Sequence, residues 1–189
     1  VFGKTDHAGT TPLALRQDAL RDAVNIINAL HELTRDATDT ARFTVGRMLV
    51  TPNSPNSVAS HVLFSVDVRH PDPVTLDRLG KAVEPAAKKA AKQCTIKVTP
   101  TLHDDPCVFD AGVVDAIERA ASELKLPSLR LPSGASHDAM YLARVCPTGM
   151  IFVPCEKGVS HNEAESAKSA DLAAGARVLT AALLELANK

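Results

Sequence analysis

The side chains with the clearest capacity for chemistry include His161, which lies in a glycine-led turn near the end of this 189-residue chain. That turn, residues 158–162, follows the apolar run 150–154. Catalytic groups of α/β proteins commonly follow a buried strand in this way, and a neutral imidazole there can bind a divalent metal ion. The alternative is an exposed loop histidine without a ligand. Since a metal site usually needs about three or four ligands, this candidate is incomplete by itself.

Two carboxylates, Glu163 and Glu165, follow the candidate ligand closely. Either could accept a hydrogen bond from the His161 imidazole and fix its orientation. The commoner alternative is that both are solvated loop charges.

A second candidate imidazole, His7, precedes a turn of small residues, Ala8-Gly9-Thr10-Thr11. Small side chains allow a ligand to approach the backbone closely. His7 could therefore donate a hydrogen bond to a carbonyl oxygen that gains negative charge in a transition state. The alternative is that His7 only stabilises the turn.

Two further residues have the chemistry to bind an anion. Arg69 ends a strand with alternating apolar residues, and Asn56 lies in the turn before that strand. A guanidinium group matches the planar carboxylate, and the Asn56 amide could share the same anion. The alternative is that Arg69 forms a surface ion pair with Asp67, which would contribute little to stability.

Residues 1–103 contain the elements that must position His7, Asn56 and Arg69. Hydrophobic periodicity and turn residues predict the order β-α-β-β-α-β, with Thr11 and Pro12 at the start of the first helix. This order is typical of a ferredoxin-like α+β fold, a four-stranded antiparallel sheet with both helices on one face. The predicted elements are a truncated strand 1–4, a helix to about residue 33, strands 42–50 and 62–69, a helix 72–93 and a strand 95–101.

Residues 104–189 begin within a linker at 103–106 and differ from residues 1–103 in their hydrophobic pattern. Alternating helices and short apolar strands indicate part of a parallel α/β sheet. Two strands are too few for an independent sheet covered on both faces, so this region resembles half a domain. The predicted elements are helices 111–124, 137–144 and 171–187 and strands 129–131 and 150–153.

Composition excludes several classes of protein. Hydrophobic residues make up 45% of the chain, enough for an ordinary core, and the net charge is -1 with interspersed signs. We therefore expect neither a nucleic-acid partner nor a membrane-surface partner. No apolar run approaches the roughly 18–20 residues of a membrane span. The four cysteines lack CxxC spacing, which favours reduced structural thiols in a cytoplasmic protein over a catalytic cysteine.

Five motifs in order along the chain together resemble one family. They are His7-Ala8-Gly9-Thr10-Thr11-Pro12 with Arg16 and Asp18-Ala19, Pro52-Asn53 to Asn56, Asp67-Val68-Arg69, Ser133-Gly134-Ala135-Ser136-His137-Asp138-Ala139, and Gly158-Val159-Ser160-His161-Asn162. The chain is similar to the branch of dinuclear-metal M20 amidohydrolases that includes carbamoylases, allantoate amidohydrolases and β-ureidopropionases. Each motif alone is weakly specific, but five in sequence make a chance likeness improbable.

The resemblance implies a role for each region. Residues 1–103 correspond to a dimerisation, or lid, domain, and residues 104–189 to the C-terminal part of a metallopeptidase-like catalytic domain, in a homodimer joined through the lid. The implied site residues are His161 as the last metal ligand, His7 as the group that reaches the partner's active site and polarises the scissile carbonyl, Asn56 and Arg69 as carboxylate ligands, and Ala135, Ser136 and His137 as a substrate-contacting loop.

The chain also departs from the family. Ser136 stands where the family usually has glycine, which restricts the approach of the backbone to a substrate. Glu163 stands where relatives often have proline, which leaves the ligand loop less rigid. The other metal ligands and the general-base glutamate are absent. We therefore expect the C-terminal part of an enzyme roughly twofold longer, inactive by itself.

The resemblance implies hydrolysis of a ureido (N-carbamoyl) or related amide C–N bond in a small carboxylate substrate, such as an N-carbamoyl amino acid or allantoate. It implies two divalent metal ions in each intact active site, zinc or manganese, with cobalt or nickel as alternatives. An aminoacylase or dipeptidase with a related lid is one competing function. An inactive, truncated dimerisation module is another.

Overall fold

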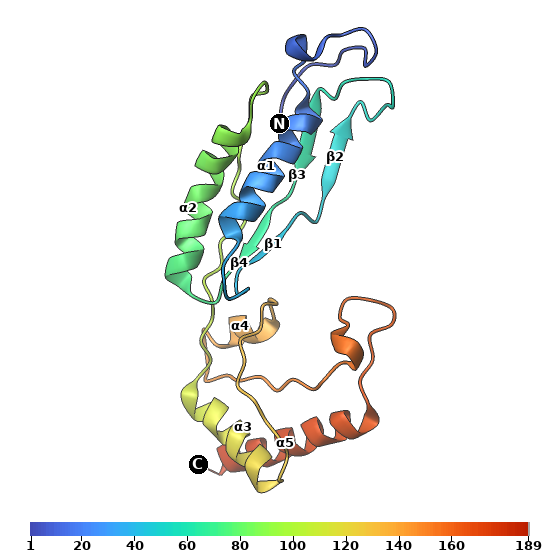
Figure 1. The fold of residues 1–189 in the computed structure, drawn as a ribbon. Coiled ribbons are helices and arrows are strands. Elements are labelled where there is room, and N and C mark those ends of the chain that lie inside the picture. Colours follow the sequence, from blue (N-terminus) through green and yellow to red (C-terminus); the bar gives the residue numbers. More distant parts are fainter. Residues whose placement is uncertain (189) are drawn as a thin grey trace. The chain divides into compact units, whose positions relative to one another are not determined.

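The computed structural model describes residues 1–188 (Figure 1). The chain divides into two compact units, Val1–Pro106 and Cys107–Lys189. The two units are described separately.

Two antiparallel strand pairs form the sheet layer of unit 1. β1 (Arg42–Thr44) pairs with β4 (Asp67–Arg69), and β2 (Met48–Thr51) pairs with β3 (His61–Phe64). Between the two pairs, residues 45–47 face only residues 65–66. One extra residue on one strand is a β-bulge, which interrupts the ladder and bends the strand. The predicted strands 42–50 and 62–69 are therefore each divided in two.

The two outer strands of the predicted sheet are reduced to single bridges. Phe2 pairs with both His61 and Thr95, which gives the lateral order Thr95, Phe2, β3, β2. The amides next to Phe2 have other acceptors, since Gly3 N–H donates to the Ser60 carbonyl and Lys4 N–H to the Gln17 carbonyl. Continuous strands at 1–4 and 95–101 were therefore wrong, although Ile96 and Val98 still pack against the core.

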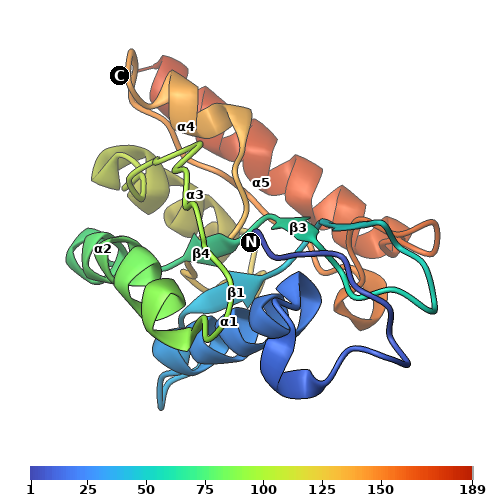
Figure 2. The same ribbon diagram turned by 90° about the horizontal axis from the view of Figure 1, so that it is seen from above.

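Two long helices, α1 (Ala19–Thr34) and α2 (Pro73–Ala90), pack against each other and against the strands (Figure 1 and Figure 2). Their apolar faces meet the sheet and bury a core of small and branched side chains. The residues buried at its centre are Ala19, Ala23, Ile26, Leu30, Val62 and Ala87.

The two helix starts turned out differently from each other. The second helix begins at residues 72–73 as predicted, because the Asp72 carboxylate accepts the Thr75 N–H and Pro73 lies in the first turn. Thr11 does not cap α1. A short 3-10 helix, η1 (Leu13–Leu15), intervenes, and the Asp18 carboxylate caps α1 by accepting the Leu20 N–H at 3.1 Å. The first helix therefore begins later than predicted.

A buried carboxylate joins α1 to the segment after α2. Asp22 is 2% exposed, and it accepts N–H groups from Lys92, Gln93 and Cys94 at 3.0, 2.8 and 2.9 Å. Burial alone would raise the pKa of Asp22, but these hydrogen bonds outweigh it and hold that pKa below its usual value. Burial and the neighbouring Asp22 also raise the pKa of the Cys94 thiol to about 11. A thiol with so high a pKa is a structural one.

Unit 2 is built mainly from α3 (Ala111–Glu123) and α5 (Ser169–Ala187), which pack together. The short helices α4 (Asp138–Leu142) and η2 (Glu156–Gly158) lie in the intervening loops. Residues 129–131 and 150–153 form no regular strand. A strand needs a neighbour for its backbone hydrogen bonds, and no described segment pairs with them. Among the described residues, no helix is long and apolar enough to span a membrane.

Candidate functional site

Backbone pairing brings two of the predicted site residues together in unit 1. His7 forms an antiparallel bridge with Ser57, Ala8 N–H donates to the Asn56 carbonyl at 3.0 Å, and Val58 N–H donates to the Asp6 carbonyl at 2.8 Å. His7 and Asn56, which are far apart in sequence, are therefore neighbours on adjoining turns.

The His7 ring has a fixed hydrogen-bond partner. Gly9 N–H donates to its Nδ1 at 3.0 Å, and the ring is otherwise exposed. A backbone N–H can only donate, so Nδ1 must be the acceptor and the neutral ring carries its proton on Nε2. A side chain at position 9 would place its Cβ 3.2 Å from His7 Cε1, so glycine leaves room for the ring. His7 thus presents an N–H donor to an external group.

Arg16, to which we assigned no role from the sequence, stabilises this turn. Its guanidinium donates to the carbonyls of Ala8 at 2.5 Å and Thr11 at 2.9 Å. Both carbonyls belong to the turn that follows His7. The only sequence signal for this role is the position of Arg16 within the family motif, since the contact spans the intervening η1.

The Asn56 side chain is exposed and partly engaged. Its Oδ1 accepts hydrogen bonds from Ser54 Oγ at 2.8 Å and Ser57 Oγ at 3.4 Å, which leaves Nδ2 to donate outward. Next to it is an open hollow of about 390 Å³. The residues that line the hollow include Ala8, Arg16, Asn53, Ser57 and Val58.

β4, which ends with Arg69, lies at the opposite end of unit 1 from the turn that precedes α1 (Figure 1). Arg69 is eight positions after His61, at the far end of β3 and β4, which corresponds to roughly 25 Å of extended chain. Asp67 accepts from Arg69 Nε at 3.1 Å and from Nη2 at 2.6 Å. The hydrogen bond from Arg69 lowers the pKa of Asp67. The structure therefore contains the Asp67 ion pair and does not place Arg69 beside His7.

Three predicted substrate-contacting residues share one loop of unit 2. Ala135 N–H donates to Ser133 Oγ at 3.2 Å, and His137 Nε2 lies 3.1 Å from the same oxygen. The His137 ring also packs against Phe152, with centroids 5.5 Å apart. Ser136 is exposed and has no left-handed φ, so the serine found here in place of glycine is accommodated without backbone strain.

His161 occupies a strained position in a separate loop of unit 2. Its φ is 56°, in the left-handed region that non-glycine residues rarely adopt. The His161 N–H donates to Glu165 Oε2 at 2.8 Å. Glu165 thus holds the backbone of the loop, and the predicted contact between this carboxylate and the imidazole is not formed. Strain held by a specific hydrogen bond is common at functional sites.

The donor set for a metal ion is incomplete. Within residues 1–188, no group of three or more His, Cys, Asp or Glu side chains is placed to hold one. His161 therefore does not form a metal site with the side chains that the structure describes.

Comparison with known proteins gives a consistent family assignment. The chain is 38% identical over 190 residues to an N-carbamoyl-L-amino-acid amidohydrolase of Rhizobium meliloti, covering 98% of this chain and 45% of that protein. It is 31% identical over 187 residues to allantoate amidohydrolase of Escherichia coli K12, covering 98% of this chain and 46% of that protein. Among solved structures, a hydantoinase/carbamoylase family amidase of Burkholderia vietnamiensis matches 97% of this chain and 45% of its own, with a TM-score of 0.91 and 38% identity.

The chain thus spans about half the length of the curated relatives it matches. The family model described as Peptidase family M20/M25/M40 matches residues 7–185, nearly all of the sequence. The chain belongs to this peptidase family.

Proposed function

We propose that the whole protein hydrolyses the C–N bond of a ureido group in a small carboxylate substrate, such as an N-carbamoyl amino acid or allantoate. The observation that carries this proposal is the likeness to N-carbamoyl-L-amino-acid amidohydrolases, which extends over 98–100% of the chain at 38% identity. The outward Nε2–H of His7 supports it, because such a donor is what a carbonyl needs as it gains negative charge.

We further propose that unit 1 is the lid, with the ferredoxin-like topology β-α-β-β-α-β, and that two lids form a homodimer. The separation of His7 from Arg69 supports this. Roughly 25 Å of chain between His61 and Arg69 is far longer than a small ureido acid, which favours a site in which His7 and Arg69 come from different lids over one in which a single lid supplies both. Two copies related by a twofold axis can form such a site, each site taking His7 and Asn56 from one protomer and Arg69 from the other.

In such a composite site each side chain has a distinct task. His7 Nε2–H donates to the scissile carbonyl oxygen and stabilises its developing charge. Arg69 and Asn56 Nδ2 hold the substrate carboxylate, which fixes the carbonyl in a reactive orientation. The loop that carries Ala135, Ser136 and His137 contacts the rest of the substrate.

Members of this family are generally metal-dependent. We propose two divalent ions, zinc or manganese, with cobalt or nickel as alternatives, which would supply Lewis-acid activation of water. His161 would contribute one imidazole, and residues outside this sequence would contribute the others. Because the described side chains do not complete a metal centre, the roles derived above do not depend on the ions.

The first experiment assays the whole protein for ammonia release from N-carbamoyl amino acids and allantoate, beside deacylation of N-acetyl amino acids and cleavage of dipeptides. We expect turnover of the ureido compounds. Preference for N-acetyl amino acids or dipeptides would instead indicate the aminoacylase or dipeptidase alternative.

Mixed dimers test the division of labour between protomers. His7→Ala and Arg69→Ala should each inactivate a homodimer, but a mixed dimer keeps one site with both groups intact. Random mixing of the two variants should therefore restore about a quarter of the wild-type sites, since half the dimers are mixed and each has one complete site of two. If one lid served one site with both residues, no activity would return.

A further inference from the structure

A second guanidinium lies beside Arg69 on the sheet of unit 1. Arg42 in β1 is paired directly with Arg69 in β4. Directly opposed residues of an antiparallel pair point to the same face, with Cβ atoms about 4.5–5.5 Å apart. The next pair, Phe43 with Val68, faces the other way, and Phe43 packs against the core. Arg42 and Arg69 therefore share the face directed away from the helices.

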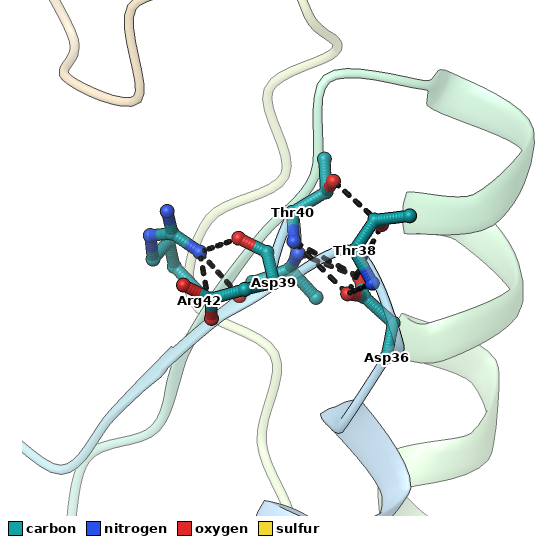
Figure 3. Close-up of polar contacts among 6 residues, drawn as sticks. Asp36, Thr38, Asp39, Thr40 and Arg42 are labelled. Carbon is teal, nitrogen blue, oxygen red and sulfur yellow. Dashed lines mark hydrogen bonds and ion pairs between the residues drawn. The ribbon is translucent and has the colours of Figure 1, made fainter.

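Arg42 is held through one guanidinium nitrogen, Nη1. Its Nη1 donates to the main-chain carbonyl of Asp39, to the Ala41 carbonyl at 3.0 Å and to Asp39 Oδ1 at 3.4 Å. Figure 3 shows these contacts, with the other guanidinium nitrogens turned away from Asp39. Asp39 has a left-handed φ of 50°, which is part of the turn that directs its carbonyl toward Arg42.

The loop that supplies these acceptors is itself tightly organised (Figure 3). The Asp36 carboxylate accepts the N–H groups of Thr38 at 3.0 Å, Thr40 at 3.0 Å and Ala41 at 2.8 Å. The amides of Ala41 and Thr40 in particular lower the pKa of Asp36 to about 2, so this carboxylate is ionised and the loop is closed at neutral pH. The carbonyl groups that accept hydrogen bonds from Arg42 therefore belong to a well-ordered loop.

The remaining donors of Arg42 have no partner among residues 1–188. Only Nη1 is used, which leaves Nε–H and both N–H groups of Nη2, and the side chain is 57% exposed. Like charges directly opposite each other across a strand pair destabilise it. Asp67 pairs with Arg69 at 2.6 Å, and Asp39 pairs with Arg42 at 3.4 Å through Nη1 alone. An anion between the two arginines would reach the Arg42 donors that Asp39 does not use.

We propose that Arg42 is a specificity-determining residue that binds a second carboxylate of the substrate, so that the preferred substrates are ureido dicarboxylates. This inference rests on the proposed function, in which Arg69 holds the first carboxylate. Arg42 and Arg69 are adjacent and on one face, so two acidic groups of one small molecule can reach both. The exposed Asp67 pair is worth only about 0.2–1 kcal/mol, so a substrate carboxylate can compete with Asp67 for Arg69.

The test compares two substrates of the whole protein, N-carbamoyl-L-aspartate with two carboxylates and N-carbamoyl-L-alanine with one. Arg42→Gln should lower kcat/KM for the aspartate compound by about tenfold to a hundredfold, the usual range for losing a charge-assisted hydrogen bond. The alanine compound should change by no more than about twofold. Arg42→Lys should recover part of the loss, because it restores the charge without the planar fork.

Arg47→Gln is the matched control, since it removes the same charge from the exposed bulge that follows β1 without touching the β1–β4 pair. It should leave the ratio of kcat/KM values for the two substrates unchanged. An equal loss on both substrates in Arg42→Gln, or the same loss of discrimination in Arg47→Gln, would overturn the proposal.

A binding measurement separates this inference from the proposed function. In the 189-residue chain, succinate should shift the Nε–Hε NMR resonances of Arg42 and Arg69 at concentrations at which acetate does not, and Arg42→Gln should abolish the Arg69 response to succinate. If the whole protein hydrolyses no ureido compound but succinate acts in this way, the proposed function fails and the dicarboxylate site remains. If ureido hydrolysis occurs while Arg42 responds in neither experiment, the dicarboxylate site is refuted.

Discussion

The two units bury very different cores, although each contains two long helices. In unit 1, α1 and α2 cover a strand layer and enclose large side chains, with Ile26 and Leu30 each 2% exposed. In unit 2, α3 and α5 pack against each other without a strand layer among the described residues, and the buried residues at their contact are all small or β-branched. Several large apolar side chains of unit 2 remain at least half exposed: Leu129, Leu131, Tyr141, Leu142, Leu172, Leu179, Leu183 and Leu184.

The difference indicates which unit can bury its large apolar side chains within its own core. Each apolar side chain left in water forgoes about 1.5–3 kcal/mol of burial energy, and contiguous exposed apolar surface normally marks an interaction site. α5 is apolar around much of its circumference, which is typical of a helix covered on several sides. Unit 1 encloses large side chains in its core, although Leu13, Leu15 and Val74 remain more than half exposed. Unit 2 buries no large side chain at its helix contact and leaves more of them in water.

The largest expected difference is in thermal unfolding, when the two units are produced as separate proteins. We expect residues 1–106 to unfold in one cooperative thermal transition, because their core is closed. Residues 107–189 should show helical far-ultraviolet circular dichroism, no cooperative transition and binding of a hydrophobic dye, as loosely packed helical states do. A cooperative transition of residues 107–189 in isolation would remove the contrast between the units.

A matched pair of leucines should sharpen the same contrast within the intact chain. Leu30 on α1 is 2% exposed and Leu183 on α5 is 56% exposed. Leu30→Ala should cost about 2–5 kcal/mol of unfolding free energy, from lost burial and the cavity left behind. Leu183→Ala should change it by no more than about 0.5 kcal/mol, as most surface substitutions do. Denaturant titration measures both, and equal losses would mean that α5 is covered after all.

The buried carboxylate of unit 1, Asp22, should make a smaller, pH-dependent contribution to the free energy of unfolding. Lys92, Gln93 and Cys94 all donate to Oδ2 of Asp22, so Asp22→Asn can keep one oxygen for them but removes the negative charge. We therefore expect a loss of about 1–3 kcal/mol at neutral pH. Because folding lowers the pKa of Asp22 from its ordinary 3.8, its contribution is fully present above that value and is lost as the pH falls below it. The wild-type and variant stabilities should therefore converge in acid.

Asp77→Asn provides the control for that measurement, since Asp77 is exposed and pairs only with Lys81 at 2.7 Å. It should change stability by no more than about 0.5 kcal/mol. A pH-independent difference between wild type and Asp22→Asn would show that the buried carboxylate does not act through its charge.

Local signals in the sequence predicted the helices well. Asp72 and Pro73 marked the start of α2, and the helix 111–124 appears as Ala111–Glu123. The start of α1 was wrong because Arg16 reaches back to the carbonyls of Ala8 and Thr11, and hydrophobic periodicity carries no sign of such a contact. The bulge at residues 45–47 was missed for a related reason, since strand register depends on the partner strand.

The candidate site was also predicted only in part. The sequence identified His7, Asn56 and His161 by their chemistry, but it did not predict the contacts that hold them in place. His7 and Asn56 meet through a bridge between distant segments, and Glu165 holds the backbone of His161. Arg42 was overlooked because only the observed register places it opposite Arg69.

The smallest expected difference is in the tautomers of the two candidate imidazoles, His7 in unit 1 and His161 in unit 2. Gly9 N–H fixes Nδ1 of His7 as an acceptor, whereas His161 is held through its main chain and its ring has no hydrogen-bond partner among residues 1–188. Long-range ¹H–¹⁵N spectra, recorded where both rings are neutral, should show His7 as the Nε2–H tautomer alone. His161 should show averaged nitrogen shifts, because its tautomers exchange freely. Gly9→Pro removes the donor and should give His7 the averaged shifts of His161. If His7 already showed averaged shifts in the wild type, the turn would not prepare its Nε2–H for a substrate carbonyl, and the donor role assigned to unit 1 would lose its basis.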